Sequence, residues 1–277
     1  SSILTESFFG LKGQEDLGGG LKAMFKLESS IAVDTGAAAG ATFWDKNAYI
    51  GVAGSLGTLA LGNQESLFKT EGNAFSAFGA SSLLSTTNLF TAISGLGGSW
   101  QNTVGYTSPN LSGLTLSAQH SAREGNTGAS AATVNGGATA VAANYTAGAL
   151  GLSAVYGDVR STTNAAVTDR QRAWLLGASY DFSVVKAFAQ YGQVKSEAAD
   201  DTAKTWQLGA IVPVTEAGSV HAAFGQVKVD GDKAKQFSLA YHHALSKRTS
   251  AYAGGAYVKA DDAFKATVLA VGVRHAF

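Results

Sequence analysis

Residues 264–277 read Phe-Lys-Ala-Thr-Val-Leu-Ala-Val-Gly-Val-Arg-His-Ala-Phe, and this stretch decides the fold class. Large apolar residues alternate with smaller or polar ones: Leu269, Val271 and Val273 share one face, while Gly272 lies on the other. A period of two is typical of a β-strand that has two different environments on its two sides. The stretch therefore predicts a strand with one strongly apolar face.

The same alternation recurs along the whole chain. Fifteen segments show it: 5–16, 21–32, 43–54, 58–66, 100–109, 114–122, 138–147, 150–158, 170–182, 185–195, 204–215, 219–229, 236–245, 249–259 and 264–277. Aromatic residues near both ends of the apolar faces are typical of a membrane barrel with two interfacial girdles. We expect an all-β fold, a transmembrane antiparallel β-barrel. Its outer face should carry Trp174, Leu176, Trp206, Leu208, Phe237, Leu239, Tyr241, Leu269, Val271 and Val273.

Composition excludes several other classes of protein. Charged residues make up 14% of the 277 residues, below the ~25% that is typical of soluble domains. No stretch approaches the ~20 apolar residues that a membrane helix needs. The 20 basic and 20 acidic residues balance, so no global charge attracts nucleic acid. The chain has no cysteine, its histidines lack ligand spacing and its glycine clusters precede no helix, so we expect no disulfide, metal or cofactor.

Connections between the expected strands alternate in length. Short turns such as 17–20 and 246–248 alternate with longer loops at 30–42, 67–99, 123–137, 158–169, 196–204, 229–235 and 260–263. Short turns on one rim and long loops on the other indicate an outer-membrane barrel with periplasmic turns. No linker interrupts the pattern, so residues 1–277 are expected to form a single barrel domain.

The strand count predicts one more strand. The first and last of the fifteen segments run in the same direction, whereas bacterial single-chain barrels have an even number of antiparallel strands. We therefore expect a complete barrel of sixteen strands, with the missing strand preceding residue 1.

Four segments resemble a known family. Residues 9–28 read Phe-Gly-Leu-Lys-Gly-Gln-Glu-Asp-Leu-Gly-Gly-Gly-Leu-Lys-Ala-Met-Phe-Lys-Leu-Glu and are similar to strands of the general porins of β-proteobacteria. Residues 47–51, 56–62 and 104–113 resemble later family segments, and Phe277 matches the terminal assembly signal. The resemblance implies a homotrimeric porin of a Gram-negative outer membrane, surrounded by lipid. It also implies passive diffusion of small hydrophilic solutes and ions.

The resemblance further implies a constriction formed by the third loop. Residues 67–99 occupy that position and are the longest gap between expected strands. A loop of this length within a compact domain tends to be functional. Its apolar side chains, Phe68 and Phe90 among them, are expected to anchor it against the inner wall.

Pores of this family oppose basic wall residues to acids on the inward loop, so that charge selects ions at close range. Parity places Lys12, Lys22 and Lys26 on lumen-facing positions, and Lys46 stands where the family often has a basic residue. Asn63, by contrast, replaces an arginine that is usual in the family, and Gly105 likewise stands where a basic residue is common. We therefore expect only modest selectivity.

The candidate acids are Glu65 and Glu71, near the start of the long loop, with Lys69 between them. The sequence predicts that this loop sets the waist of the pore and faces a wall patch that includes Lys26 and Lys46.

Two alternative functions remain open at this stage. A barrel enzyme of the protease or acyltransferase type would need serine, histidine and aspartate at one rim, and such enzymes have fewer strands. A receptor or adhesin barrel would normally have larger loops or a plug. Strand count disfavours the first and loop length the second. For assembly, the first four strands carry small residues, among them Gly10, Gly13, Ala48 and Gly51. Together with the family resemblance, they place the contact between subunits around these strands and the missing one.

Overall fold

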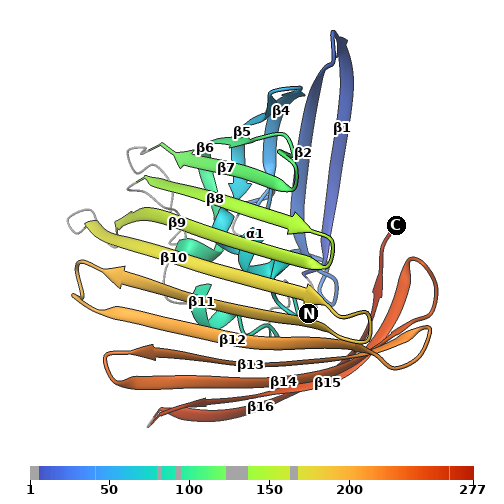
Figure 1. Cartoon of the computed structure of the whole chain (residues 1–277), viewed down its shortest axis with the longest axis vertical. Coiled ribbons are helices and arrows are strands. Elements are labelled where there is room, and N and C mark those ends of the chain that lie inside the picture. The colour runs from blue at the N-terminus through green and yellow to red at the C-terminus, as the bar shows by residue number, and fades with distance from the viewer. Residues whose placement is uncertain are drawn as a thin grey trace.

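The computed structural model describes residues 6–40, 42–79, 83–91, 95–122, 137–162, 168–261 and 263–277. Within these residues, fifteen strands form one continuous curved antiparallel sheet (Figure 1). They are β1 (Phe8–Gly18), β2 (Leu21–Ala32), β4 (Ala48–Gly54), β5 (Gly57–Glu65), β6 (Ser99–Thr107), β7 (Leu114–Ser121), β8 (Ala138–Ala147), β9 (Leu150–Thr162), β10 (Thr168–Asp181), β11 (Lys186–Ser196), β12 (Thr202–Pro213), β13 (Gly218–Val229), β14 (Asp232–Ala244), β15 (Thr249–Ala260) and β16 (Phe264–His275). The two-residue strand β3 (Ala37–Ala38) pairs with β2.

Each wall strand pairs with the next one along the chain, and every pairing is antiparallel. Because direction reverses at each connection, β1 and β16 run the same way. In the described part of the chain these two strands are the edges of the sheet, paired with β2 and β15 respectively. The two edges are not paired with each other in this sheet order. Closure by a sixteenth wall strand stays a prediction.

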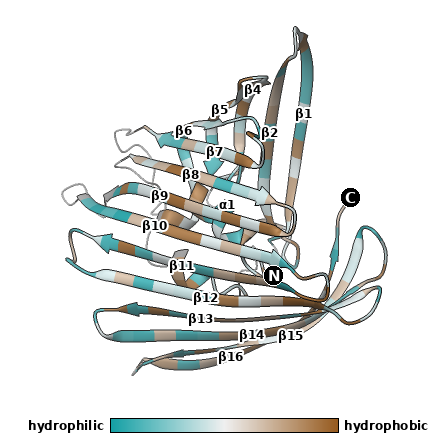
Figure 2. Ribbon diagram, in the orientation of Figure 1, coloured by the Kyte–Doolittle hydropathy of each residue, from teal (hydrophilic) through white to brown (hydrophobic). Residues whose placement is uncertain are grey.

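The predicted outer face is confirmed. Leu208, Leu239 and Val271 are strongly exposed, whereas Leu175, whose parity is opposite to that of its neighbours Trp174 and Leu176, is 2% exposed. Figure 2 shows apolar bands along the strands, which fit a wall that faces lipid. The predicted tryptophans of this face pack on neighbouring aromatic rings. The ring pairs are Trp174 with Tyr191, at 5.3 Å between centroids, and Trp206 with Phe224, at 5.4 Å.

Three expected boundaries differ from the structure. The strand expected at 43–54 begins only at Ala48, so Lys46 precedes β4 instead of lying on it. The loop expected at 229–235 is a tight turn at Asp230 and Gly231, whose φ angles of 44° and 100° are those an Asp-Gly hairpin turn adopts. The loop expected at 158–169 is largely strand, and residues 163–167 lie outside the described residues, as do 123–136 of the loop expected at 123–137.

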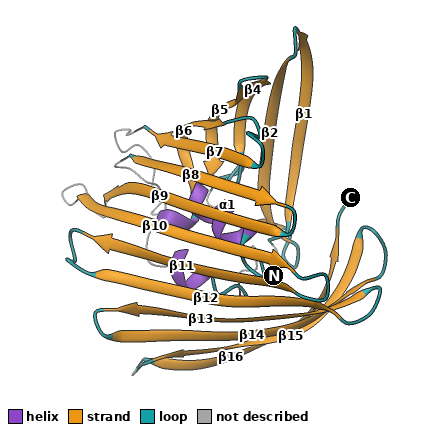
Figure 3. Ribbon diagram, in the orientation of Figure 1, coloured by secondary structure: helices purple, strands orange, loops and turns teal. Residues whose placement is uncertain are grey.

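The segment expected as a structureless loop contains helices. These are α1 (Leu67–Ala74), α2 (Asn88–Thr91) and the 3-10 turn η1 (Gly95–Gly97). Figure 3 shows them on the concave side of the sheet. Ser66 caps α1, since its side chain accepts a hydrogen bond from the backbone N–H of Lys69 at 3.1 Å. No helix in the described part of the chain is long and apolar enough to cross a membrane.

Candidate functional site

The helical segment is our name for the described residues between β5 and β6, 66–79, 83–91 and 95–98, and it packs against the inner face of the wall. The segment and the first strand after it contribute five large buried apolar side chains: Leu67, Phe68, Phe90, Leu96 and Trp100. Small apolar residues of the wall complete this cluster: Ala138, Ala140, Ala142, Val155, Val159, Ala173, Leu175, Val194, Ala203 and Val227. Burial of aromatic side chains stabilises such a contact strongly. The side chains expected to anchor the segment therefore do contact the inner wall.

Two glycines allow aromatic rings of the segment to approach the wall backbone. A Cβ atom added at Gly177 would lie 2.7 Å from Cγ of Phe75, and one added at Gly157 would lie 2.7 Å from Cε2 of Phe68. Both distances are shorter than the contacts that a Cβ atom makes with non-bonded atoms, so a side chain at either position would displace the ring. The small residues on the inner face, visible in the sequence, thus provide the space that the segment fills.

Four glutamines on the inner face bind the segment through their amides, and the sequence analysis missed them: Gln119, Gln190, Gln207 and Gln236. Gln190 lies opposite Gln207 in the register of β11 and β12, and Gln236 is on β14. Nε2 of Gln190 donates to the Gly72 carbonyl at 2.6 Å, and Nε2 of Gln236 donates to the Leu83 carbonyl at 3.0 Å. The sequence shows only that these polar side chains occupy strand positions that point inwards. It does not show their partner atoms, because these are distant along the chain.

A pair of stacked histidines also supports the segment. The rings of His221 and His242 lie 4.1 Å apart, although the sequence placed them on separate strands without a shared role. Nδ1 of His221 is 2.8 Å from the Ala77 carbonyl, and the same ring contacts Phe78. This contact adds a polar anchor on β13.

At the beginning of α1, lysines and carboxylates of wall and segment meet. Glu65 lies 3.6 Å from Nζ of Lys46 and 2.9 Å from Nζ of Lys69. Lys46 also bonds Glu6 at 2.5 Å. We call the following six residues the charge cluster: Glu6, Lys26, Glu28, Lys46, Glu65 and Lys69.

The second half of the charge cluster is on β2. Lys26 lies 2.9 Å from Glu28, whose other oxygen accepts from Nδ2 of Asn47 at 2.7 Å. Burial lowers the pKa of Lys46, but its hydrogen bond to Glu6 and the charges of Glu65 and Glu28 outweigh burial, so the pKa is raised. Lys46 therefore keeps its charge at neutral pH.

The remaining predicted cations lie on the same inner face. Lys12 is directly opposite Lys26 in the register of β1 and β2, and Lys22 is opposite Asp16. Asn63 has a different role from the others, because its Nδ2 donates to backbone carbonyls of the connection before β4, with the Lys46 oxygen at 3.0 Å. Asn63 therefore positions Lys46.

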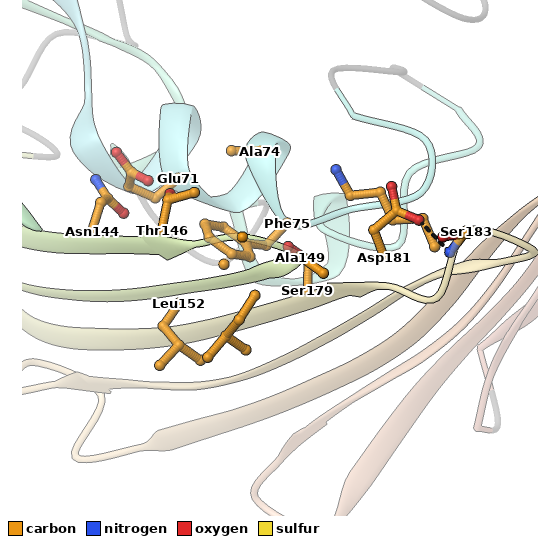
Figure 4. A pocket seen from close by; sticks show the side chains of 14 residues that line it. Glu71, Ala74, Phe75, Asn144, Thr146, Ala149, Leu152, Ser179, Asp181 and Ser183 are labelled. Carbon is orange, nitrogen blue, oxygen red and sulfur yellow. Dashed lines mark hydrogen bonds between the residues drawn. The ribbon is translucent and has the colours of Figure 1, made fainter. Parts of the chain in front are cut away.

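Glu71 is separate from the charge cluster, which corrects the expectation that it faces Lys26 and Lys46. It accepts from the Ser153 hydroxyl at 3.4 Å and from the side chain of Asn144, on β9 and β8. Glu71 and Asn144 line a cleft of about 640 Å³ that reaches the turns after β8 and β10 (Figure 4). Burial raises the pKa of Glu71, and the two hydrogen bonds only partly oppose this.

We expect Glu71→Gln to raise the thermal midpoint at pH 7 and to leave it unchanged at low pH. A carboxyl group with a raised pKa in the folded state destabilises the fold as pH rises from its ordinary value through the raised one. The neutral amide removes this penalty while still accepting from Ser153. Thermal unfolding of both proteins across this pH range measures the effect. A midpoint that falls at pH 7 would show that the charged carboxylate is instead favourable there.

A sheet that is apolar on its outer face, and that carries polar and charged side chains with a packed helical segment on its inner face, defines a transmembrane β-barrel channel.

Comparisons with known proteins agree. The Gram-negative porin family matches residues 2–263. Outer membrane porin protein 32 of Delftia acidovorans is 33% identical over 99% of this chain and 80% of that protein. An outer membrane porin protein of Bordetella pertussis is 30% identical over 100% of this chain and 84% of its own length. The chain therefore belongs to the Gram-negative porin family, and it is an outer-membrane porin, a passive channel.

Solved structures match the same fold. An anion-selective porin from Comamonas acidovorans superposes with a TM-score of 0.87 and is 27% identical, over 100% of this chain and 91% of that chain. The trimer form of OmpT of Vibrio cholerae has a TM-score of 0.73 over 97% of this chain and 87% of its own. Its identity is 14%, so this second likeness concerns the fold alone.

Proposed function

We propose that the helical segment narrows the lumen and that small hydrophilic solutes and ions diffuse past it beside the charge cluster. The observation that carries this proposal is the ion-pair chain from Lys46, before β4, through Glu65 on β5 to Lys69 on α1. Charged groups at a narrow passage select permeating ions by sign. Transport requires no cofactor, because solutes move down their own gradients.

The balance of charge argues for weak selectivity. The charges of the three lysines and the three glutamates of the charge cluster sum to zero. Nearby, Lys22 faces Asp16, whereas Lys12 faces Lys26, so one positive charge remains in excess. The similar porin from Comamonas acidovorans is described as anion-selective. We infer a modest preference for anions in this chain.

The reversal potential of the wild-type porin under a KCl gradient in a planar bilayer tests this proposal. A small potential with the sign for anions is expected. A potential close to that of a perfectly anion-selective or cation-selective pore would contradict the balanced cluster.

We also propose a homotrimer that associates through the outer surface of β1–β5. The side chains nearest to a Cβ atom added at Gly10 and Gly51 are those of Glu28 and Met24, so these two positions have inward parity and do not present a small side chain to lipid. The outward Phe25, Ile50 and neighbouring apolar residues form a shallow groove of about 620 Å³ there. A solved porin of the same fold is described in a trimer form. Electrophoresis of unboiled samples is expected to give a trimer band, and a monomer in mild detergent would overturn this arrangement.

A further inference from the structure

Six lysines lie on the outer face of the sheet near the ends of β12–β16, at the rim where the longer connections β2–β4 and β5–β6 also lie. They are Lys204, Lys228, Lys233, Lys235, Lys259 and Lys265. Strand parity establishes their direction, since Lys204 shares a face with Leu208, and Lys235 with Phe237. Lys233 is partly exposed and the other five are exposed. Figure 2 shows hydrophilic ends on these strands beside their apolar middles.

The register of the sheet aligns these lysines in two rows. In the first row Lys204 is opposite Lys228, which is opposite Lys233. In the second row Lys235 is opposite Lys259, which is opposite Lys265. Directly opposed side chains have Cβ atoms about 5 Å apart, and like charges at this distance destabilise a sheet. Among the described residues, none of the six forms an ion pair.

The neighbouring strands differ in this respect. On β10, Arg170 bonds Asp158 at 2.5 Å and Arg172 bonds Glu197 at 3.1 Å, so acids of the protein compensate the outward arginines. The acids closest in sequence to the lysine rows, such as Asp232 and Asp261, form no ion pair with them in the described part of the chain. No acid in the described part of the chain therefore compensates the charge of the lysine rows, which makes them a binding surface for an external anion.

Their depth in the wall indicates where that anion lies. The second row is one cross-strand pair beyond the outward Phe237 and Tyr257, which is about 7 Å along the strand. Aromatic residues of a barrel mark the level of the membrane interface. The lysines thus lie at headgroup depth, at the end with the longer loops. In the described parts of β1–β8, no lysine or arginine has outward parity.

We propose that the two lysine rows bind an anionic lipid of the outer leaflet whose headgroup carries more than one phosphate. Each row offers several ammonium groups to one phosphate, which replaces their mutual repulsion by charge-assisted hydrogen bonds. The rows lie two residues apart on β14, so a headgroup with two phosphates can contact both. Lipid acyl chains would extend along the apolar band below. The first row, on β12–β14, is separated from β1 by β15, β16 and the predicted sixteenth strand, so it remains open to lipid in the proposed trimer.

Native mass spectrometry of the purified porin tests this binding with three probes: lipid A with two phosphates, lipid A with one phosphate, and phosphatidylcholine. Affinity is expected to fall in that order. Each basic residue near an anionic surface adds to the free energy of binding. The loss of two lysines should therefore weaken binding of the first probe roughly 30-fold. The two test variants are Lys228→Gln/Lys233→Gln and Lys259→Gln/Lys265→Gln.

The matched control is Lys247→Gln/Arg248→Gln, which removes the same charge from the short turn after β14 and should bind like the wild type. Lys228→Arg/Lys233→Arg should also retain binding, and heat-dependent gel mobility verifies that each variant folds. Wild-type affinity in both glutamine variants would overturn the proposal. Equal loss in the control, or competition by inorganic phosphate at matched concentration, would overturn it too.

Discussion

Gly177→Val is expected to raise the single-channel conductance. The added Cβ would lie 2.7 Å from Phe75, which holds the end of α1 against β10. Overpacking of this kind costs about 1–3 kcal/mol. That is sufficient to shift the docking equilibrium of the helical segment roughly 5- to 150-fold. Displacement of the segment would widen the passage that it narrows, and recordings in planar bilayers would measure this directly.

A double variant separates displacement of the segment from damage to the wall. Phe75→Ala/Gly177→Val removes the ring that the new side chain meets, so conductance should return towards the wild-type value. If Gly177→Val conducts like the wild type while the folded barrel is intact, Phe75 does not hold a constriction.

The second large effect is expected at Lys46. Lys46→Glu would lower the ratio of anion to cation permeability, because it leaves Glu6 without a cation, leaves Glu65 with Lys69 alone and adds another acid. A unit charge about 6 Å from an ion changes its energy by about 0.7 kcal/mol even in water-like surroundings. Reversal of one charge changes the energy of each ion by about 1.4 kcal/mol, so anion permeability should fall and cation permeability should rise, each roughly tenfold.

Glu65→Gln should shift reversal potentials in the opposite direction, towards anions, since it removes the negative charge that Lys46 and Lys69 share. Lys247→Glu, in a periplasmic turn, provides the control with an equal change of charge. Identical reversal potentials in all these proteins would remove the charge cluster from the permeation path.

Much of the fold was predictable because the alternation of residues within one strand identifies which side chains share each of its two faces. The period of two assigned the outer residues correctly, including Trp174 and Leu208, without knowledge of any partner strand. The same parity placed Lys26 and Lys12 on the inner face. The prediction of a longer loop at 229–235 was wrong. Asp230-Gly231 is a short-range signal of a tight turn, and that signal was overlooked.

The position of Glu71 could not be derived from strand parity, because it is on a helix. With 3.6 residues per turn, residues two apart point in nearly opposite directions. Lys69 therefore faces Glu65, while Glu71 faces Ser153. Ser66 before Leu67 was a readable cap for this helix. The glutamine contacts and the lysine rows depend on register between strands, which one strand's sequence does not contain.

The most direct test of the account is a cross-link between the helical segment and the inner wall. A Cβ atom added at Gly209 would lie 3.0 Å from Cβ of Ala77, close to the ~3.8 Å of a disulfide, and the chain has no cysteine of its own. Ala77→Cys/Gly209→Cys is expected to form a disulfide in the folded porin, detected by mass spectrometry without reduction. Ala77→Cys/Leu208→Cys, with the second thiol on the outer face, should not. Absence of the first bond, or equal formation of the second, would contradict a helical segment packed inside the barrel.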